Sequence, residues 1–257
     1  MLLGIHKSSS NVAARAELGI FPLTITVLPL MAKYWIKLNV SPNNKLVWYT
    51  LNENIENYNY LIKSFTDIIG FNHLYANKNT FSIPVTINSI REKLKSRYES
   101  YVARVMDNSS KLKTYKLIKD SYKQEVYLNL PLPKEDLKMF TKFCISNHNL
   151  AIETGRHANK NKSKVDMNNR ICDLCNSRDI EDERHFLLHC LKYNNIRKSF
   201  MQDIKPINPT INRKSPDELF MYLLTNKDPD ILIPLIKFVK KCFIIRTGFI
   251  ESITTIS

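Results

Sequence analysis

Residues 170–193 read RICDLCNSRDIEDERHFLLHCLKY, and this stretch decides how the rest of the chain is interpreted. It carries three cysteines and a histidine in the pattern C-x2-C-x9-H-x4-C, formed by Cys172, Cys175, His185 and Cys190. A Cys-x-x-Cys turn places two thiolates on one metal ion with little strain, and a short loop then returns two further ligands. The sequence therefore predicts a tetrahedral zinc (Zn) site, with the remaining chain as its scaffold.

Three cysteines and one histidine complete a four-ligand coordination sphere and leave no open position for a reactive water molecule. The predicted zinc ion would accordingly support structure and take no part in catalysis. The fourth ligand has an alternative, because His185 and His189 are four residues apart and would lie on one face of a helix. The arrangement C-x2-C-x9-H-x3-H would use His189 and leave Cys190 as a free thiol.

The composition favours a helix-rich protein in a reducing compartment. The 257 residues include only five glycines, and the eleven prolines fall mostly between periodic segments. Five cysteines, an odd number, do not make a disulfide framework, and the sequence shows no signal peptide. We expect an intracellular protein, in the nucleus or the cytoplasm. The longest apolar run, residues 20–32, is broken by two prolines and too short to span a bilayer, so we expect no membrane role.

Apolar residues recur at helical spacing along most of the chain, which predicts a mainly α fold. The clearest pattern covers residues 84–105, where apolar side chains return every three or four positions. The other expected helices lie at residues 12–18, 22–38, 43–70 (two helices), 112–127, 137–144, 193–204, 217–225 and 229–246. A domain that is helical throughout must bury these apolar faces against one another.

The formal net charge of +14 is concentrated just before the zinc pattern, since residues 91–170 contain 18 basic and 9 acidic side chains. Residues 159–169, which read NKNKSKVDMNN, form a polar loop that can neutralise several phosphates at once. A polyanionic partner is indicated, nucleic acid first, although a lysine-rich solvated surface is the alternative explanation. The candidate phosphate contacts are Arg156, Lys160, Lys162, Lys164 and Arg170.

Several blocks together resemble the region that follows the polymerase core in non-LTR retrotransposon reverse transcriptases of the LINE or jockey-like kind. The zinc pattern itself, with CDLC and EDERHFLLHCLKY, is one of them. The others are AELGIFPL at residues 16–23, YWIKL at residues 34–38 and ISNHNLAIETGRH at residues 145–157. Residues 41–130 match only loosely.

The resemblance implies a helical thumb-like segment followed by a helical domain with a small Cys-Cys-His-Cys zinc knuckle that helps to hold nucleic acid. It also favours Cys190 over His189, because the family has a cysteine at that place. We expect a helical thumb-like or linker region at residues 1–130 and a zinc-knuckle carboxy-terminal domain at residues 131–257.

The motifs of an active enzyme are missing from this sequence. It has no aromatic-x-Asp-Asp motif for a two-metal polymerase site and no amino-terminal endonuclease region. We therefore expect a non-enzymatic protein that binds RNA or DNA and takes no small-molecule substrate. An upstream polymerase domain in a longer parent protein is a further expected partner. Two alternatives stay open: a zinc-stabilised protein-interaction module, and a decaying transposon fragment without activity.

Overall fold

The computed structural model describes residues 10–40, 55–72, 82–156 and 163–254. Within these ranges the chain consists of helices and connecting turns, with one isolated antiparallel bridge between Ile171 and Ile180 and no longer strand. The mainly α class predicted from periodicity is thus confirmed. None of the helices in these ranges is both long and apolar enough to cross a membrane. All five cysteines lie in the described ranges, and each is a free thiol.

The chain divides into two compact units. One, the three-helix unit, comprises Ile20–Arg104, and the other, the knuckle unit, comprises Met1–Gly19 together with Val105–Ser257. Residues 105–130 fall in the knuckle unit of this division, as do residues 1–19. Whether residues 1–130 and 131–257 are separate domains stays a prediction.

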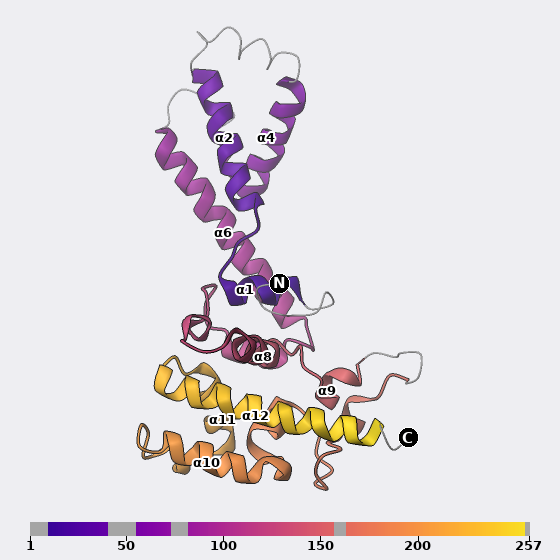
Figure 1. Cartoon of the computed structure of the whole chain (residues 1–257). Coiled ribbons are helices and arrows are strands. Elements are labelled where there is room, and N and C mark those ends of the chain that lie inside the picture. The colour runs from indigo at the N-terminus through magenta and orange to yellow at the C-terminus, as the bar shows by residue number, and fades with distance from the viewer. Residues whose placement is uncertain (1–9, 41–54, 73–81, 157–162, 255–257) are drawn as a thin grey trace. The chain divides into compact units, whose positions relative to one another are not determined.

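The three-helix unit packs α2 (Thr24–Val40), α4 (Ile55–Ile69) and α6 (Ile83–Asp107) side by side, as the upper part of Figure 1 shows. The indole of Trp35 is buried and donates a hydrogen bond of 2.8 Å to the Asn59 side chain. The apolar core of this unit consists of Ala32, Trp35, Ile36, Ile62, Phe65, Ile69, Ile87 and Ile90. The helices expected at residues 22–38 and 84–105 are confirmed. Of the two expected at residues 43–70, the second is α4, and the first lies outside the described residues.

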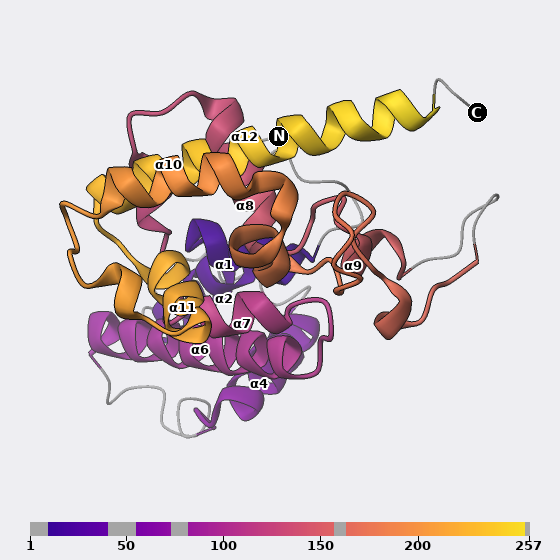
Figure 2. The ribbon, with the colours of Figure 1, turned by 90° about the horizontal axis from the view of Figure 1, so that it is seen from below.

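In the knuckle unit, α12 (Pro229–Thr254) packs against α8 (Lys134–Cys144) and α10 (Asn194–Ile204), and both views show α12 alongside α10 (Figures 1 and 2). Aromatic rings fill the centre. The ring of Phe186, which lies in the zinc pattern, is 4.7 Å from that of Phe243 on α12, measured between centroids. The shorter helices of the unit are α1 (Asn11–Leu18), α7 (Lys113–Ile118), α9 (Ala151–Thr154) and α11 (Pro216–Thr225). The zinc pattern is therefore joined to the main core of this unit.

Local signals at the ends of α1 account for its bounds. The Ser10 side chain accepts a hydrogen bond from the Ala13 amide at the start of the helix. Gly19 ends it in the left-handed conformation, with φ of 62°. A Cβ atom at Gly19 would lie 2.4 Å from the backbone nitrogen of Gln124, so only glycine allows this close approach. The helix expected at residues 12–18 is confirmed.

The basic helix expected at residues 112–127 is wrong beyond its first two turns. Helix α7 ends at Ile118, and Lys119 already has an extended backbone. Tertiary contacts outweigh the helical periodicity here, because the Glu125 amide donates a 3.0 Å hydrogen bond to the Glu17 carbonyl of α1. The chain then forms a short 3-10 turn at Val126–Asn129.

A buried carboxyl joins helix α1 to the rest of the knuckle unit. Glu17 is 1% exposed, and its oxygens accept hydrogen bonds from the hydroxyl of Tyr115, at 2.7 Å, and from that of Tyr127. The Tyr127 hydroxyl also lies 2.8 Å from the hydroxyl of Thr141 on α8. Burial raises the pKa of Glu17 to about 7, although the two tyrosine hydrogen bonds act to lower it. In the folded protein Glu17 is therefore mostly neutral only below a pH of about 7.

We expect this carboxyl to make stability depend on pH. The pKa of Glu17 is higher in the folded than in the unfolded state. The stability that the neutral carboxyl contributes is therefore fully present below a pH of about 4.5 and is lost as the pH rises through about 7. The loss is on the order of 3 kcal/mol, from about 1.4 kcal/mol per pKa unit. The free energy of unfolding of Glu17→Gln, taken relative to that of the wild type, should therefore rise from pH 5 to pH 8. Urea denaturation at both pH values measures this, with the exposed Glu99→Gln as control. An equal difference from the wild type at both pH values would contradict the assignment.

Candidate metal centre

The first two ligands lie on a small hairpin. The Cys172 amide donates to the Asp179 carbonyl at 2.9 Å, and the Glu181 amide donates to the Arg170 carbonyl at 2.9 Å, on either side of the isolated bridge. Between these bonds the chain reverses through Cys175 and through Arg178, whose φ is 59°. The hairpin thus holds Cys172 beside the bridge and Cys175 in the turn, which places the two thiols of the Cys-x-x-Cys sequence together as a zinc knuckle requires.

The other two ligands lie at the ends of one π-helical turn, His185–His189. The Asp182 carboxylate accepts a 2.7 Å hydrogen bond from the His185 amide at the start of this turn. At its end the Cys190 amide donates to the His185 carbonyl at 2.8 Å, which closes the wider ring of a π-turn. Arg197 of α10 then donates to the carbonyl of Cys190 at 2.9 Å. These hydrogen bonds therefore fix the backbone at His185 and Cys190 without the help of a metal ion.

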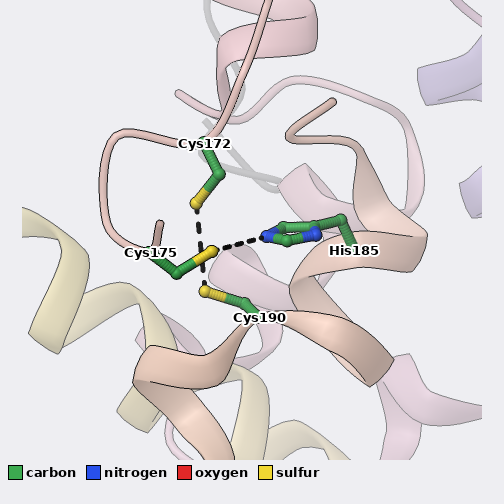
Figure 3. Close-up of side chains that lie close together, drawn as sticks. All are labelled: Cys172, Cys175, His185 and Cys190. Atoms are coloured by element: carbon green, nitrogen blue, oxygen red, sulfur yellow. Dashed lines mark hydrogen bonds between the residues drawn. The ribbon is translucent and has the colours of Figure 1, made fainter. Parts of the chain in front are cut away.

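The four side chains converge on one point (Figure 3). Their ligand atoms all lie within 4.8 Å of one another; the Sγ atoms of Cys172 and Cys190 are 3.9 Å apart, and Cys175 Sγ is 3.4 Å from His185 Nε2. Around a tetrahedral zinc ion these separations would be about 3.8 Å and about 3.6 Å, given metal–sulfur and metal–nitrogen bonds of about 2.3 and 2.0 Å. The cluster can therefore hold a metal ion such as zinc with little movement.

The alternative ligand His189 stands apart from the cluster. It is exposed, whereas Cys190 is fully buried and belongs to the converging group. His185 faces the thiols with Nε2, and its Nδ1 is buried with no hydrogen-bond partner among the described residues. The carboxylate of Asp179 lies 3.6 Å from that Nδ1 and is placed to orient the ring. The geometry therefore selects the Cys-Cys-His-Cys set.

Hydrogen bonds among the four side chains show that they act as one group. The contact with Cys190 raises the pKa of Cys172 to about 12, with burial adding to the rise, and lowers the pKa of Cys190. Burial alone would lower the pKa of His185, but its contacts with the thiols of Cys172 and Cys175 raise it. A cation bound here needs thiolates and a neutral imidazole, so metal binding must release protons.

A buried ion pair joins the hairpin to α12. Glu181 is 1% exposed and pairs with the guanidinium of Arg246, which also donates to the Asn149 carbonyl at 3.0 Å. The second oxygen of Glu181 accepts a 2.7 Å hydrogen bond from the Ala151 amide at the start of α9. Burial raises the pKa of Glu181, and the charge of Arg246 opposes that rise. Three segments of the chain, namely the hairpin, α12 and the start of α9, therefore meet around one carboxylate beside Cys172.

A second buried carboxylate lies two residues before His185. Glu183 accepts hydrogen bonds from Ser146 at 2.6 Å and from Thr114 at 3.1 Å, and His148 Nε2 lies 2.9 Å from it. Burial opposes ionisation of Glu183, but the hydrogen bonds from His148 and Ser146 outweigh it and lower the pKa to about 2. These partners could not be predicted from local sequence, because they are 35 to 69 residues away along the chain.

The candidate phosphate contacts fall into three groups. Lys164 is exposed, and Lys160 and Lys162 lie outside the described residues. Arg156 is directed inward: it pairs with Glu153 at 2.6 Å and donates two bonds of 3.0 Å to the hydroxyl and carbonyl of Ser110. Its donors already have partners, so Arg156 serves to join α9 to the segment before α7.

The prediction that Arg170 contacts phosphate conflicts with its placement. The residue is 7% exposed, and its guanidinium donates to the carbonyls of Val165, at 3.0 Å, and Ile152, at 2.9 Å. Its stem packs against Gly155, where an added Cβ would lie 2.8 Å from Arg170 Cγ. Arg170 therefore holds the base of the hairpin, because buried carbonyls need a donor and this guanidinium supplies it.

We expect metal content to follow the converging set. Cys190→Ser should lose most of its zinc, since one of three thiolates is removed from a closed coordination sphere. His189→Ala should keep one zinc per chain, because that imidazole is outside the cluster. Elemental analysis of both purified variants provides the measurement. Loss of metal from His189→Ala alone would make His189 the ligand in place of Cys190.

Comparison with known proteins adds no relative on which to base an assignment. No family model matches the chain, and neither a curated protein nor a solved structure matches it.

Proposed function

We propose that the chain is a zinc-stabilised nucleic-acid-binding protein, equivalent to the carboxy-terminal part of a non-LTR retrotransposon reverse transcriptase without polymerase chemistry. The observation that carries this proposal is the net charge of +14, with its excess in residues 91–170. The resemblance of the blocks at residues 145–157 and around the zinc pattern supports the same assignment.

Zinc has a structural role in this proposal. Three thiolates and an imidazole would fill a tetrahedral ion, so no position is left for substrate or water. The ion would cross-link the hairpin that carries Cys172 to the π-turn that carries His185. These elements hold Ile171 and Arg170, at the end of the basic loop, in fixed positions. The metal would thus order the segment that leads to Lys164.

Salt dependence tests the nucleic-acid function. We expect the zinc-loaded chain to bind fluorescent RNA or DNA oligonucleotides, with log affinity falling steeply and linearly with log salt concentration. Each phosphate contact adds about 0.7 to that slope for a single strand and about 0.9 for a duplex. Fluorescence anisotropy at several salt concentrations measures it for both nucleic acids. No binding at low salt, or affinity that is flat with salt, would refute the proposal.

A protein-interaction module is the second candidate, and exposed apolar side chains on the three-helix unit favour it. Leu23 is 74% exposed, Tyr60 on α4 is 71% exposed and Ile68 is 61% exposed. A contiguous patch of such side chains would be typical of a protein-binding surface. A protein partner whose affinity survives charge reversal at Lys160, Lys162 and Lys164 would favour this second function over the first.

A further inference from the structure

A groove of about 140 Å³ lies between α10 and α12, formed by residues other than the four candidate ligands. Its floor is apolar, because the buried rings of Phe200 and Phe238 stack with their centroids 4.9 Å apart and their planes 11° from parallel. Ile196 and Pro234 extend this apolar surface. Ser199 also lines the groove. The groove therefore has room for one flat aromatic group.

Two lysines stand at the α12 side of the groove. Lys237 and Lys241 are four residues apart, so they lie on one face of the helix, and both are exposed. The salt bridges that α12 makes within the described residues are those of Lys240 with Asp136 and of Arg246. The charges of Lys237 and Lys241 therefore have no carboxylate partner in the described part of the chain and are available to an anion.

The α10 side of the groove carries the exposed carboxylate of Asp203. A carboxylate only accepts hydrogen bonds at neutral pH, and in nucleic acids it accepts them from base amino groups such as N4 of cytosine. A bare phosphate ion would be repelled by Asp203 and would gain nothing from the apolar floor. The combination of apolar floor, acceptor and paired cations instead matches one complete nucleotide.

We propose that this groove binds one nucleotide of a single-stranded nucleic acid, with the base on the apolar floor and beside Asp203, and the phosphate at Lys237 and Lys241. The inference rests on the proposed nucleic-acid function. It adds the groove between α10 and α12 as a contact surface that is separate in sequence from the basic loop at residues 159–169. Contact between bases and apolar side chains, combined with a cationic track for the backbone, is the usual basis of single-strand binding. A paired base in a duplex could not enter.

The lysines are tested by matched double variants of the zinc-loaded full chain. Lys237→Gln/Lys241→Gln should weaken binding of a short single-stranded oligonucleotide by about tenfold or more at ~0.1 M salt and reduce the salt slope by about 0.7, because both lysines contact one phosphate. The control is Lys123→Gln/Lys134→Gln, which removes the same charge from two exposed lysines of the knuckle unit outside the groove. We expect the control to change affinity less than about threefold.

The base contact is tested by Asp203→Ala, which removes the acceptor, whereas asparagine would keep an acceptor oxygen. The wild type should prefer oligo(dC) to oligo(dT), because cytosine has an amino group for Asp203, and Asp203→Ala should abolish that preference while leaving the fold intact. If the wild type binds but the groove and control doubles weaken equally, or if Asp203→Ala keeps the wild-type preference, the groove assignment is overturned while nucleic-acid binding stands. If the wild type binds no nucleic acid, both proposals fail. Displacement of the oligonucleotide by an equal charge of polyglutamate would also overturn the groove assignment, because such displacement would indicate a general anion site.

Discussion

Removal of the metal ion should lower the free energy of unfolding of the knuckle unit by more than about 5 kcal/mol, the largest effect that we expect. Binding free energy at a structural zinc site is folding free energy, because the unfolded chain holds no preformed site. Here the ion would link the hairpin to the π-turn His185–His189, whose Phe186 is buried against Phe243. Loss of the cross-link should therefore loosen the central aromatic core.

Thermal unfolding with and without a zinc chelator measures this effect. Cys172→Ser should unfold at the temperature of the chelated wild type and should show no further change when chelator is added. Cys242→Ala is the matched control, since Cys242 is a buried thiol of α12 outside the ligand cluster. It should keep its response to chelator. A wild-type protein whose melting temperature is the same in chelator and in zinc would contradict a structural metal.

Breaking the ion pair beside the ligands should have the next largest effect. Arg246→Met leaves the carboxylate of Glu181 buried without its partner, which typically costs about 3–5 kcal/mol. It also removes the donor to the Asn149 carbonyl. Because Glu181 holds the start of α9 through the Ala151 amide, the loss should extend to that helix.

A double-mutant cycle separates the pair from other effects of the substitution. Glu181→Gln removes the buried charge but keeps the shape of the side chain, so Arg246→Met/Glu181→Gln should be more stable than Arg246→Met alone. Urea denaturation of the four proteins gives the coupling free energy. Additive losses would show that the two side chains are not coupled. Lys227→Met is the control, because its pair with Asp120 is exposed to solvent and should contribute little to stability.

The clustering of the four candidate ligands was predictable because each half of the site is local. Cys172 and Cys175 need only a tight turn, and His185 and Cys190 need only one turn of helix. The helix class was predictable for the same reason, since apolar spacing reports a buried face. Ser10 and Gly19 even fix the ends of α1 from local chemistry.

The partners that hold the site were not predictable from spacing. Arg170 and Arg156 look like surface cations in the sequence, but backbone carbonyls and Glu153 accept their hydrogen bonds. Glu181 looks like part of an acidic surface between the ligands, yet it pairs with Arg246, 65 residues later. The charge of a residue does not show whether its side chain faces water or a buried partner. These partners come together only when the helices pack.

The predicted helix is absent at residues 119–127 for the same reason. Their helical periodicity is real, but hydrogen bonding of Glu125 to Glu17 gives the backbone another solution. The groove between α10 and α12 also depends on packing, since Phe200 and Lys241 are far apart in sequence. What spacing alone reveals is therefore the ligand cluster, whereas its support and the other binding surface need the folded chain.

X-ray absorption at the zinc edge of the purified protein tests the central claim most directly, because it reports the atoms bound to the metal. We predict one zinc ion per chain with three sulfur ligands at about 2.3 Å and one nitrogen ligand at about 2.0 Å. A first coordination sphere with fewer than three sulfur atoms, with oxygen ligands, or a protein that retains no zinc would contradict the account.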